Sequence, residues 1–509
     1  MHRRPEVDEL KQFAQAKGLS IALGEQEQFK ILSDALIDVL ETLDAQEPAP
    51  IPILEAVRDP GRPPDPGEDP YNAIVRWCRV EADTSGILSG RRISLKDSVG
   101  VAGVPLTCGS RALSGFVPAS DSVVVERILR AGGEIVALTN MDDFALSAGG
   151  ESSFYGPTLN PFDSRRTAGG SSGGAAAALH YDGIDLSVGC DQGGSIRVPA
   201  AWCGVIGLKP THGLVPYTGI VGIDQTFDHA GPMGRSSADV AALLQTIAGK
   251  DESDPRQLEV PAGDYVAAVA KAPDTLAGVT LGVVMQGFAE EAGVQPAVVE
   301  AVEDAISRFV GLGVRIARIS IPEHLHAGGA SFATAIQGMT DLLESGGNGF
   351  GWKGRYWADL PAALGPGLRD HADDLSTQVK IYLILGAWLQ REYSGTLYAK
   401  AQNIRPTLVA AYDRALAGVD ALLMPTTPGV AHMLGSNLPL AERVLRGWAV
   451  LANTIPADMT GHPALTIPAA ETEGLPVGVM LIGEHFADDR LLSLAATYEQ
   501  HYGWLPDGA

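Results

Sequence analysis

The spacing of apolar side chains changes near residue 70. From residue 8 to about 45, apolar side chains recur three and four positions apart, as Phe29, Leu32, Leu36 and Leu40 do, which predicts amphipathic helices. Prolines then recur through residues 48–70, and proline neither donates a backbone hydrogen bond nor fits inside a helix. We therefore predict that residues 1–70 form a helical extension followed by a stiff connection.

Beyond this point short apolar runs alternate with segments of helical periodicity, and this alternation predicts an α/β architecture. The predicted strands are 135–138, 184–188, 280–284, 314–319, 419–424 and 477–482. The predicted helices are 123–131, 238–248 and 296–310, and residues 140–147 are expected to form a loop that enters a helix.

Two glycine-serine turns lie close together in the first half of the chain. The turn at residues 169–174, GGSSGG, runs into Ala175, so its amides should lie at a helix N-terminus, where negative charge is favoured. The second turn follows the predicted strand 184–188. There Gly193 and Gly194 allow a carbonyl to approach the backbone N–H groups closely, as an oxyanion hole requires. Ser195 is therefore a candidate nucleophile.

A serine hydroxyl needs a base within reach, and the G-x-S-x-G pattern of Ser-His-Asp hydrolases is absent around Ser195. Lys96 lies in a short strand-like segment, and burial lowers the proton affinity of a lysine enough for it to act as a base. Lys96, Ser171 and Ser195 could thus form a relay. Taken singly, Ser195 also fits a helix cap, and Lys96 also fits an ion pair with Asp97.

Several motifs together resemble the amidase signature family of serine hydrolases. They are Lys96 in its strand, the GGSSGG turn, GGSIR at 193–197, GLKPT at 207–211, TGHPA at 460–464 and GLPVGVMLIG at 474–483. The resemblance implies a mixed β-sheet core covered by helices, with residues 71–509 as one catalytic domain. Residues 324–396 match the family pattern least, and their tryptophans and glycine-rich loop are expected to form a substrate wall.

The family's site residues can be transferred to matching positions of this chain. Ser195 would attack the substrate, Ser171, held by a cis peptide in the family, would relay the proton, and Lys96 would be the base. The resemblance implies backbone oxyanion-hole amides at Gln192, Gly193, Gly194 and Ser195, acyl-pocket contacts from Phe144, Ala145, Leu146 and the Gln192 side chain, and supporting roles for Ser172, Asp191 and Arg197. Ordinary core packing is an equal alternative for Phe144 and Leu146.

The implied reaction is hydrolysis of a carboxylic amide through an acyl-enzyme, with no metal or organic cofactor. A carbamate or aryl-amide hydrolase of the same family is the alternative, because the same relay serves a urethane carbonyl. A tRNA amidotransferase subunit is disfavoured by the N-terminal extension, and a non-catalytic binding protein by retention of the relay positions. Gln192 and Cys190 depart from the commonest family pattern, and Gln192 resembles bacterial amidases that act on free amides.

The composition of the chain argues against some classes of binding partner. The chain has 37 Lys and Arg against 61 Asp and Glu, a net charge of −24, which makes nucleic acid and anionic membranes poor partners. We find no signal core or long apolar span, so we predict a cytoplasmic protein. The four cysteines lack zinc-site spacing. Similar extensions in bacterial amidases suggest a homodimer contact, with a simple N-terminal brace as the alternative.

Overall fold

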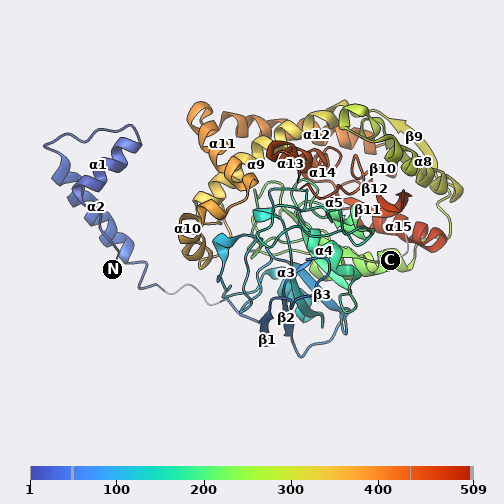
Figure 1. The fold of residues 1–509 in the computed structure, drawn as a ribbon, viewed down its shortest axis with the longest axis horizontal. Helices are drawn as coiled ribbons and strands as arrows, with labels where there is room; N and C mark the ends of the chain where they lie inside the picture. Colours follow the sequence, from blue (N-terminus) through green and yellow to red (C-terminus); the bar gives the residue numbers. More distant parts are fainter. Residues whose placement is uncertain (1, 47–50, 436, 505–509) are drawn as a thin grey trace. The chain divides into compact units, whose positions relative to one another are not determined.

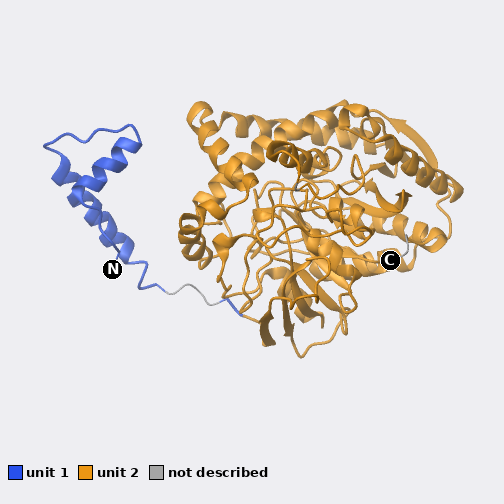
Figure 2. Cartoon of the chain, viewed as in Figure 1, with its two compact units in different colours: residues 1–52 blue, residues 53–509 orange. Residues whose placement is uncertain are grey.

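The computed structural model describes residues 2–46, 51–435 and 437–504, and the chain divides into two compact units (Figure 2). The smaller unit comprises residues 1–52 and the larger one residues 53–509. Strand β1 (Val57–Arg62) lies in the segment that we predict as a connection, yet it pairs with β2 (Ile74–Glu81) and so belongs to the larger unit.

The smaller unit is a pair of helices, α1 (Val7–Ala16) and α2 (Gln26–Glu41), as the apolar spacing predicts. The Glu9 carboxylate accepts a hydrogen bond from the Glu6 backbone N–H, which closes a capping box at the start of α1. Neither helix contains a buried residue. The large apolar side chains left exposed in this unit are Phe13, Leu19, Leu23, Phe29, Ile31, Leu32, Leu36, Val39, Leu40, Leu43 and Ile51.

A mixed sheet of 12 strands forms the centre of the larger unit within the described residues (Figure 1). Its order is β1-β2-β4-β3-β5-β7-β6-β11-β12-β10-β8-β9. β3 is parallel to both β4 and β5, β8 is parallel to β9 and β10, and the remaining pairs are antiparallel. The other strands are β3 (Arg92–Lys96), β4 (Glu134–Thr139), β5 (Leu186–Asp191), β6 (Ile206–Lys209), β7 (His229–Gly234), β8 (Thr280–Val284), β9 (Arg315–Ile319), β10 (Ala421–Pro425), β11 (Ala464–Thr472) and β12 (Leu475–Ile482).

Helices cover this sheet, and α3, α6, α8 and α15 share the largest apolar core with the strands. Helices α9, α11 and α12 lie together on the side of the larger unit away from β1 and β2 (Figure 1). The helices are α3 (Val123–Arg130), α4 (Gly173–Ala177), α5 (Arg197–Trp202), α6 (Ser237–Ile247), α7 (Tyr265–Ala270), α8 (Pro296–Gly311), α9 (Ala327–Glu344), α10 (Leu360–Asp370), α11 (Thr377–Tyr393), α12 (Thr396–Leu416), α13 (Leu440–Ala449), α14 (Ile455–Thr460) and α15 (Asp488–Tyr502).

The predicted α/β architecture is confirmed, and the predicted helices and strands are present with small shifts at their ends. The segment 140–147 differs, because it contains only a short 3-10 turn, Asp143–Ala145, and no α-helix. Phe144 and Ala145 there have positive φ angles of 45° and 62°, which are incompatible with an α-helix. Among the described helices none has the length and apolar character needed to cross a membrane.

Candidate active site

The parallel pairing of β3 with β5 brings the candidate residues together. Lys96 is the last residue of β3, and Ser195 lies in the turn that follows the end of β5. The carboxyl ends of neighbouring parallel strands meet at one edge of a sheet, where open α/β proteins place their sites. Ser171 lies in the GGSSGG turn, and Ser172 is the N-cap of α4, so this turn leads into a helix as predicted.

Lys96 is fully buried, and its Nζ donates a hydrogen bond to the Ser171 hydroxyl over 2.7 Å. Burial lowers the pKa of Lys96, and the neighbouring Cys190, Asp142 and Asp191 offset this only in part. The alternative ion pair with Asp97 is not formed, because the Asp97 carboxylate accepts hydrogen bonds from Thr107 and from the Gly109 backbone. The lysine is thus placed to be a neutral amine beside a serine hydroxyl.

The two glycine-serine turns are joined by Ser172. Its hydroxyl donates to the Cys190 carbonyl over 3.0 Å and accepts from the Cys190 backbone N–H over 3.2 Å. The Ser172 backbone N–H donates to the Ser195 carbonyl over 3.1 Å. The peptide bond between Gly170 and Ser171 is cis, and Ser171 is fully buried. These contacts fix the GGSSGG turn against the turn that carries Ser195.

A buried ion pair holds the Ser195 turn from behind. Arg197 donates to both carboxylate oxygens of Asp191 over 3.0 Å, and its Nη2 also donates to Asp458 over 2.6 Å. Burial alone would raise the pKa of Asp191, but the Arg197 guanidinium and the Ile196 backbone N–H hold it below its usual range. The Asp191 carboxylate also accepts from the Ile196 N–H over 3.0 Å, so it braces the residue after Ser195 directly.

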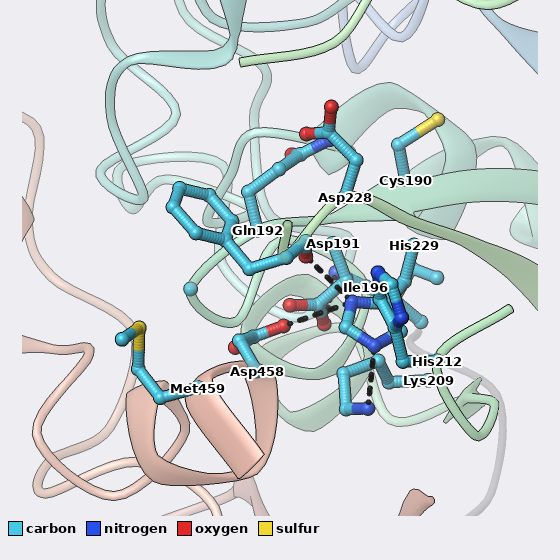
Figure 3. A network of polar contacts seen from close by, with 12 residues as sticks. Cys190, Asp191, Gln192, Ile196, Lys209, His212, Asp228, His229, Asp458 and Met459 are labelled. Carbon is cyan, nitrogen blue, oxygen red and sulfur yellow. Dashed lines mark hydrogen bonds and ion pairs between the residues drawn. The ribbon is translucent and has the colours of Figure 1, made fainter. Parts of the chain in front are cut away.

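Helix α14 and the residue before it supply two residues of this site that no sequence motif marks. Asp458 faces the Asp191 turn in Figure 3 and completes the Arg197 network. Thr454, which precedes α14, donates its hydroxyl to the Gly193 carbonyl over 2.5 Å. A Cβ atom on Gly194, whose φ is 145°, would overlap the Thr454 hydroxyl oxygen, so only glycine fits there. These residues are separated from Ser195 by more than half of the chain, and no local pattern marks them.

We expect Asp458→Ala to destabilise the protein because it leaves the buried Arg197 guanidinium short of an acceptor. The loss should be about 3 kcal/mol, as for removing one partner of a buried charged hydrogen bond. Burial and the neighbouring Asp191 raise the pKa of Asp458. A neutral amide should therefore replace it well, and Asp458→Asn should keep most of the stability. Thermal unfolding of both variants measures this, and equal losses would contradict it.

Ser195 lines a cavity, and so do most of the residues predicted to form the acyl pocket. Its described lining residues are Ala145, Leu146, Ser147, Gln192, Gly193, Ser195, Ile223, Phe227, Ser331, Phe332, Ala335, Tyr382, Trp448, Leu451 and Ile455. Phe144 is not among the described lining residues. It is 2% exposed and packs in an apolar core cluster, as the alternative of ordinary core packing predicts. None of these lining side chains carries a charge, and most are apolar.

The variable region 324–396 contributes to this wall, although not through its tryptophans. Ser331, Phe332 and Ala335 come from α9, and Tyr382 comes from α11. Trp352 and Trp357 instead line a neighbouring cavity beside Arg256. The pocket wall therefore depends on helix faces rather than on the glycine-rich loop.

No histidine is among the described residues that line the Ser195 cavity. His229 lies behind the Asp191 turn, where it accepts a hydrogen bond from Lys209 over 3.2 Å (Figure 3). Burial lowers the pKa of Lys209 to about 8 and that of His212 to about 3. These groups pack behind the turn and do not face the cavity.

One group among the described residues has the residue types of a metal site. The side-chain donor atoms of Asp413, His462 and His485 lie within 4.8 Å of one another. The two imidazole rings are tilted by 37° with their centroids 3.9 Å apart, His462 contacts Asp413 over 3.0 Å, and His485 contacts the Thr460 carbonyl over 3.0 Å. None of the three lines the Ser195 cavity. Cys108, Cys190 and Cys203 are buried free thiols.

Comparison with known proteins gives consistent matches over most of the chain. The family model described as Amidase matches residues 76–492. A glutamyl-tRNA(Gln) amidotransferase subunit from Synechococcus sp. is 38% identical over 423 residues, which are 82% of this chain and 84% of the relative.

Two solved structures have similar folds. The glutamyl-tRNA(Gln) amidotransferase subunit from Thermotoga maritima has a TM-score of 0.71 at 27% identity, covering 86% of this chain and 90% of that one. The peptide amidase of Stenotrophomonas maltophilia has a TM-score of 0.69 at 29% identity, covering 84% and 85%.

Proposed function

The chain belongs to the amidase family, and from this premise we propose that it hydrolyses a carboxylic amide to the acid and ammonia or an amine. The observation that carries the proposal is the 2.7 Å hydrogen bond between buried Lys96 and Ser171, next to the turn that presents Ser195. A neutral lysine linked to a serine is a base that can activate a second serine. The family relationship makes an amide the expected substrate.

In the proposed first step, the Ser195 oxygen attacks the amide carbonyl as its proton passes to Ser171 and the Ser171 proton passes to Lys96. The resulting oxyanion is stabilised by backbone N–H groups of residues 192–195. Lys96 then returns a proton through Ser171 to the departing nitrogen, the C–N bond breaks, and an ester to Ser195 remains. Water attacks this ester by the same relay and releases the acid. None of these steps uses a cofactor.

The lining of the Ser195 cavity supports an uncharged, largely apolar acyl group. Leu146, Phe227, Trp448 and Leu451 contribute apolar surface, and none of the described lining side chains carries a charge. A charged substrate group would lose its hydration there without a partner of opposite charge, which is costly. We therefore propose aromatic or aliphatic amides as the preferred class, with carbamates and aryl amides of similar acyl groups as the alternative.

The amidotransferase names among the relatives favour a second candidate, a component of an amidotransferase that takes ammonia from glutamine. Free glutamine carries an ammonium and a carboxylate, and the described lining of the Ser195 cavity offers neither charge a counterpart. One experiment separates the two candidates: purified protein is assayed for acid release from benzamide, an aliphatic amide, a carbamate and L-glutamine. We expect turnover of benzamide and not of glutamine; glutaminase activity without benzamide turnover would overturn the proposal.

We also propose that the N-terminal helices dimerise. Their exposed apolar side chains, such as Leu32, Leu36 and Leu40, lie in one two-helix unit, and such a surface can pair with its own copy about a twofold axis. Leu36→Glu together with Leu40→Glu should convert a dimer into a monomer, as measured by light scattering. The matched change Glu27→Gln in the same helix should leave the dimer intact. A wild-type monomer would refute dimerisation and favour the alternative, in which the extension is a simple N-terminal brace.

A further inference from the structure

Gln192, which lines the Ser195 cavity, contains an unpaired acceptor in its side chain. Gln192 lines this cavity, is 5% exposed, and donates from its Nε2 to the Tyr217 hydroxyl over 2.7 Å. Its carbonyl oxygen, Oε1, is buried and has no hydrogen-bond partner among the described residues. Buried acceptors are nearly always paired, and an unpaired one lowers stability, so this oxygen can take a hydrogen-bond donor that the described residues do not supply.

Tyr217 determines which end of the Gln192 amide is left without a hydrogen-bond partner. The Tyr217 hydroxyl donates to the Val221 carbonyl over 3.4 Å, so its oxygen is free to accept from the Gln192 Nε2. Rotating the amide by half a turn would direct the Nε2 donors away from Tyr217 and leave them without the acceptor that they have now. The observed orientation therefore leaves the carbonyl oxygen, and not the Nε2 donors, unpaired.

Tyr217 is itself held in place by Asp254 and Arg256. Its backbone N–H donates to the Asp254 carboxylate over 2.8 Å, and the Arg256 guanidinium lies 4.9 Å from its ring centroid. Arg256 in turn forms a buried ion pair with Asp254 over 2.5 Å. Burial raises the pKa of Tyr217 well above its ordinary value, so its hydroxyl stays protonated. The orientation of Gln192 thus rests on a fixed support.

We propose that the Gln192 Oε1 accepts a hydrogen bond from the N–H of the scissile carboxamide, and that Tyr217 is the positioning residue that directs Oε1 to it. The inference rests on the proposed amide hydrolysis and adds a selection rule to it. A primary or secondary amide supplies the missing donor, whereas an ester presents an oxygen that cannot donate. A site built to pair a substrate N–H rejects analogues that lack it, because the buried group then stays unpaired. The Gln192–Tyr217 pair thereby disfavours esters relative to amides.

The test compares a primary amide and a methyl ester with the same acyl group in wild type, Gln192→Leu and Tyr217→Phe. We expect kcat/KM for the amide to fall about 30-fold in Gln192→Leu and about tenfold in Tyr217→Phe, with the ester changed less than about threefold. The control Tyr382→Phe removes a hydroxyl from a tyrosine that lines the Ser195 cavity and should leave the amide-to-ester ratio unchanged. Both test variants should keep the pH dependence of wild type, since Lys96 is untouched.

The outcomes separate this inference from the proposed function. Equal losses on amide and ester, or an unchanged ratio in both variants, would overturn the role of Gln192 while wild-type amide turnover kept the proposed function. A folded wild type that hydrolyses the ester and no amide would instead refute the proposed function. Tyr217→Phe keeps the ring that packs against Arg256, so its result stands even if Gln192→Leu proves unstable.

Discussion

Ser195→Ala should abolish amide hydrolysis and leave the fold intact, because the change removes the attacking oxygen and little else. We expect kcat/KM to fall by about 10⁴-fold or more, as in other enzymes that lose a serine nucleophile. The Ser195 backbone contact to Ser172 does not involve the hydroxyl and should persist. Steady-state kinetics on the best amide, with circular dichroism to verify folding, measures the effect.

Two neighbouring serines provide a matched control for the nucleophile experiment. Ser171→Ala should lose nearly as much activity as Ser195→Ala, because Ser171 is the hydroxyl bonded to Lys96. Ser172→Ala removes only hydrogen bonds to the Cys190 backbone and should lower stability more than it lowers kcat. An acyl-enzyme trapped on Ser195, detected by mass spectrometry, would support the assignment. Activity above about 1% in folded Ser195→Ala would refute it.

Lys96→Ala should remove the pH dependence that a lysine base imposes, and it should lower amide turnover by about 10³-fold or more. Lys96 accepts a proton only as a neutral amine, and burial lowers its pKa from 10.5. Activity should therefore rise as the pH passes through the folded-state pKa and level off above it. Since esters depend less on leaving-group protonation, the variant should retain more ester than amide hydrolysis.

Other buried groups could produce a similar rise of activity with pH. The assignment of Lys96 as the base therefore needs a control. Burial raises the pKa of Asp97 to about 7 and that of Asp142 to about 6. We expect Asp97→Asn and Asp142→Asn to keep the rising limb, whereas Lys96→Ala loses it. A limb that persists in Lys96→Ala and disappears in either aspartate variant would assign the base elsewhere. Equal losses on amide and ester in Lys96→Ala would remove the argument for leaving-group protonation.

The sequence by itself determined the features that depend on neighbouring residues. The periodicity of apolar side chains is a local property, and it located α3, α6 and α8 and the strands β4, β8 and β12. The glycine-serine turns are equally local, because their glycines permit backbone angles that other residues rarely adopt. Motif resemblance led to Lys96, Ser171 and Ser195, and the parallel neighbours β3 and β5 then place Lys96 and the Ser195 turn at one sheet edge.

Only the tertiary structure decided how these groups are supported and what surrounds them. Asp458 and Thr454 approach the Ser195 turn from α14 and the segment before it, and contacts between such distant segments leave no periodic signal in the sequence. The turn of positive φ at Phe144 directs that side chain into the core, while Ala145 lines the cavity. The unpaired Gln192 oxygen likewise depends on Tyr217, 25 positions away. The lowered pKa of Lys96 is itself a consequence of burial, which results from packing of the whole fold and not from the residues beside it.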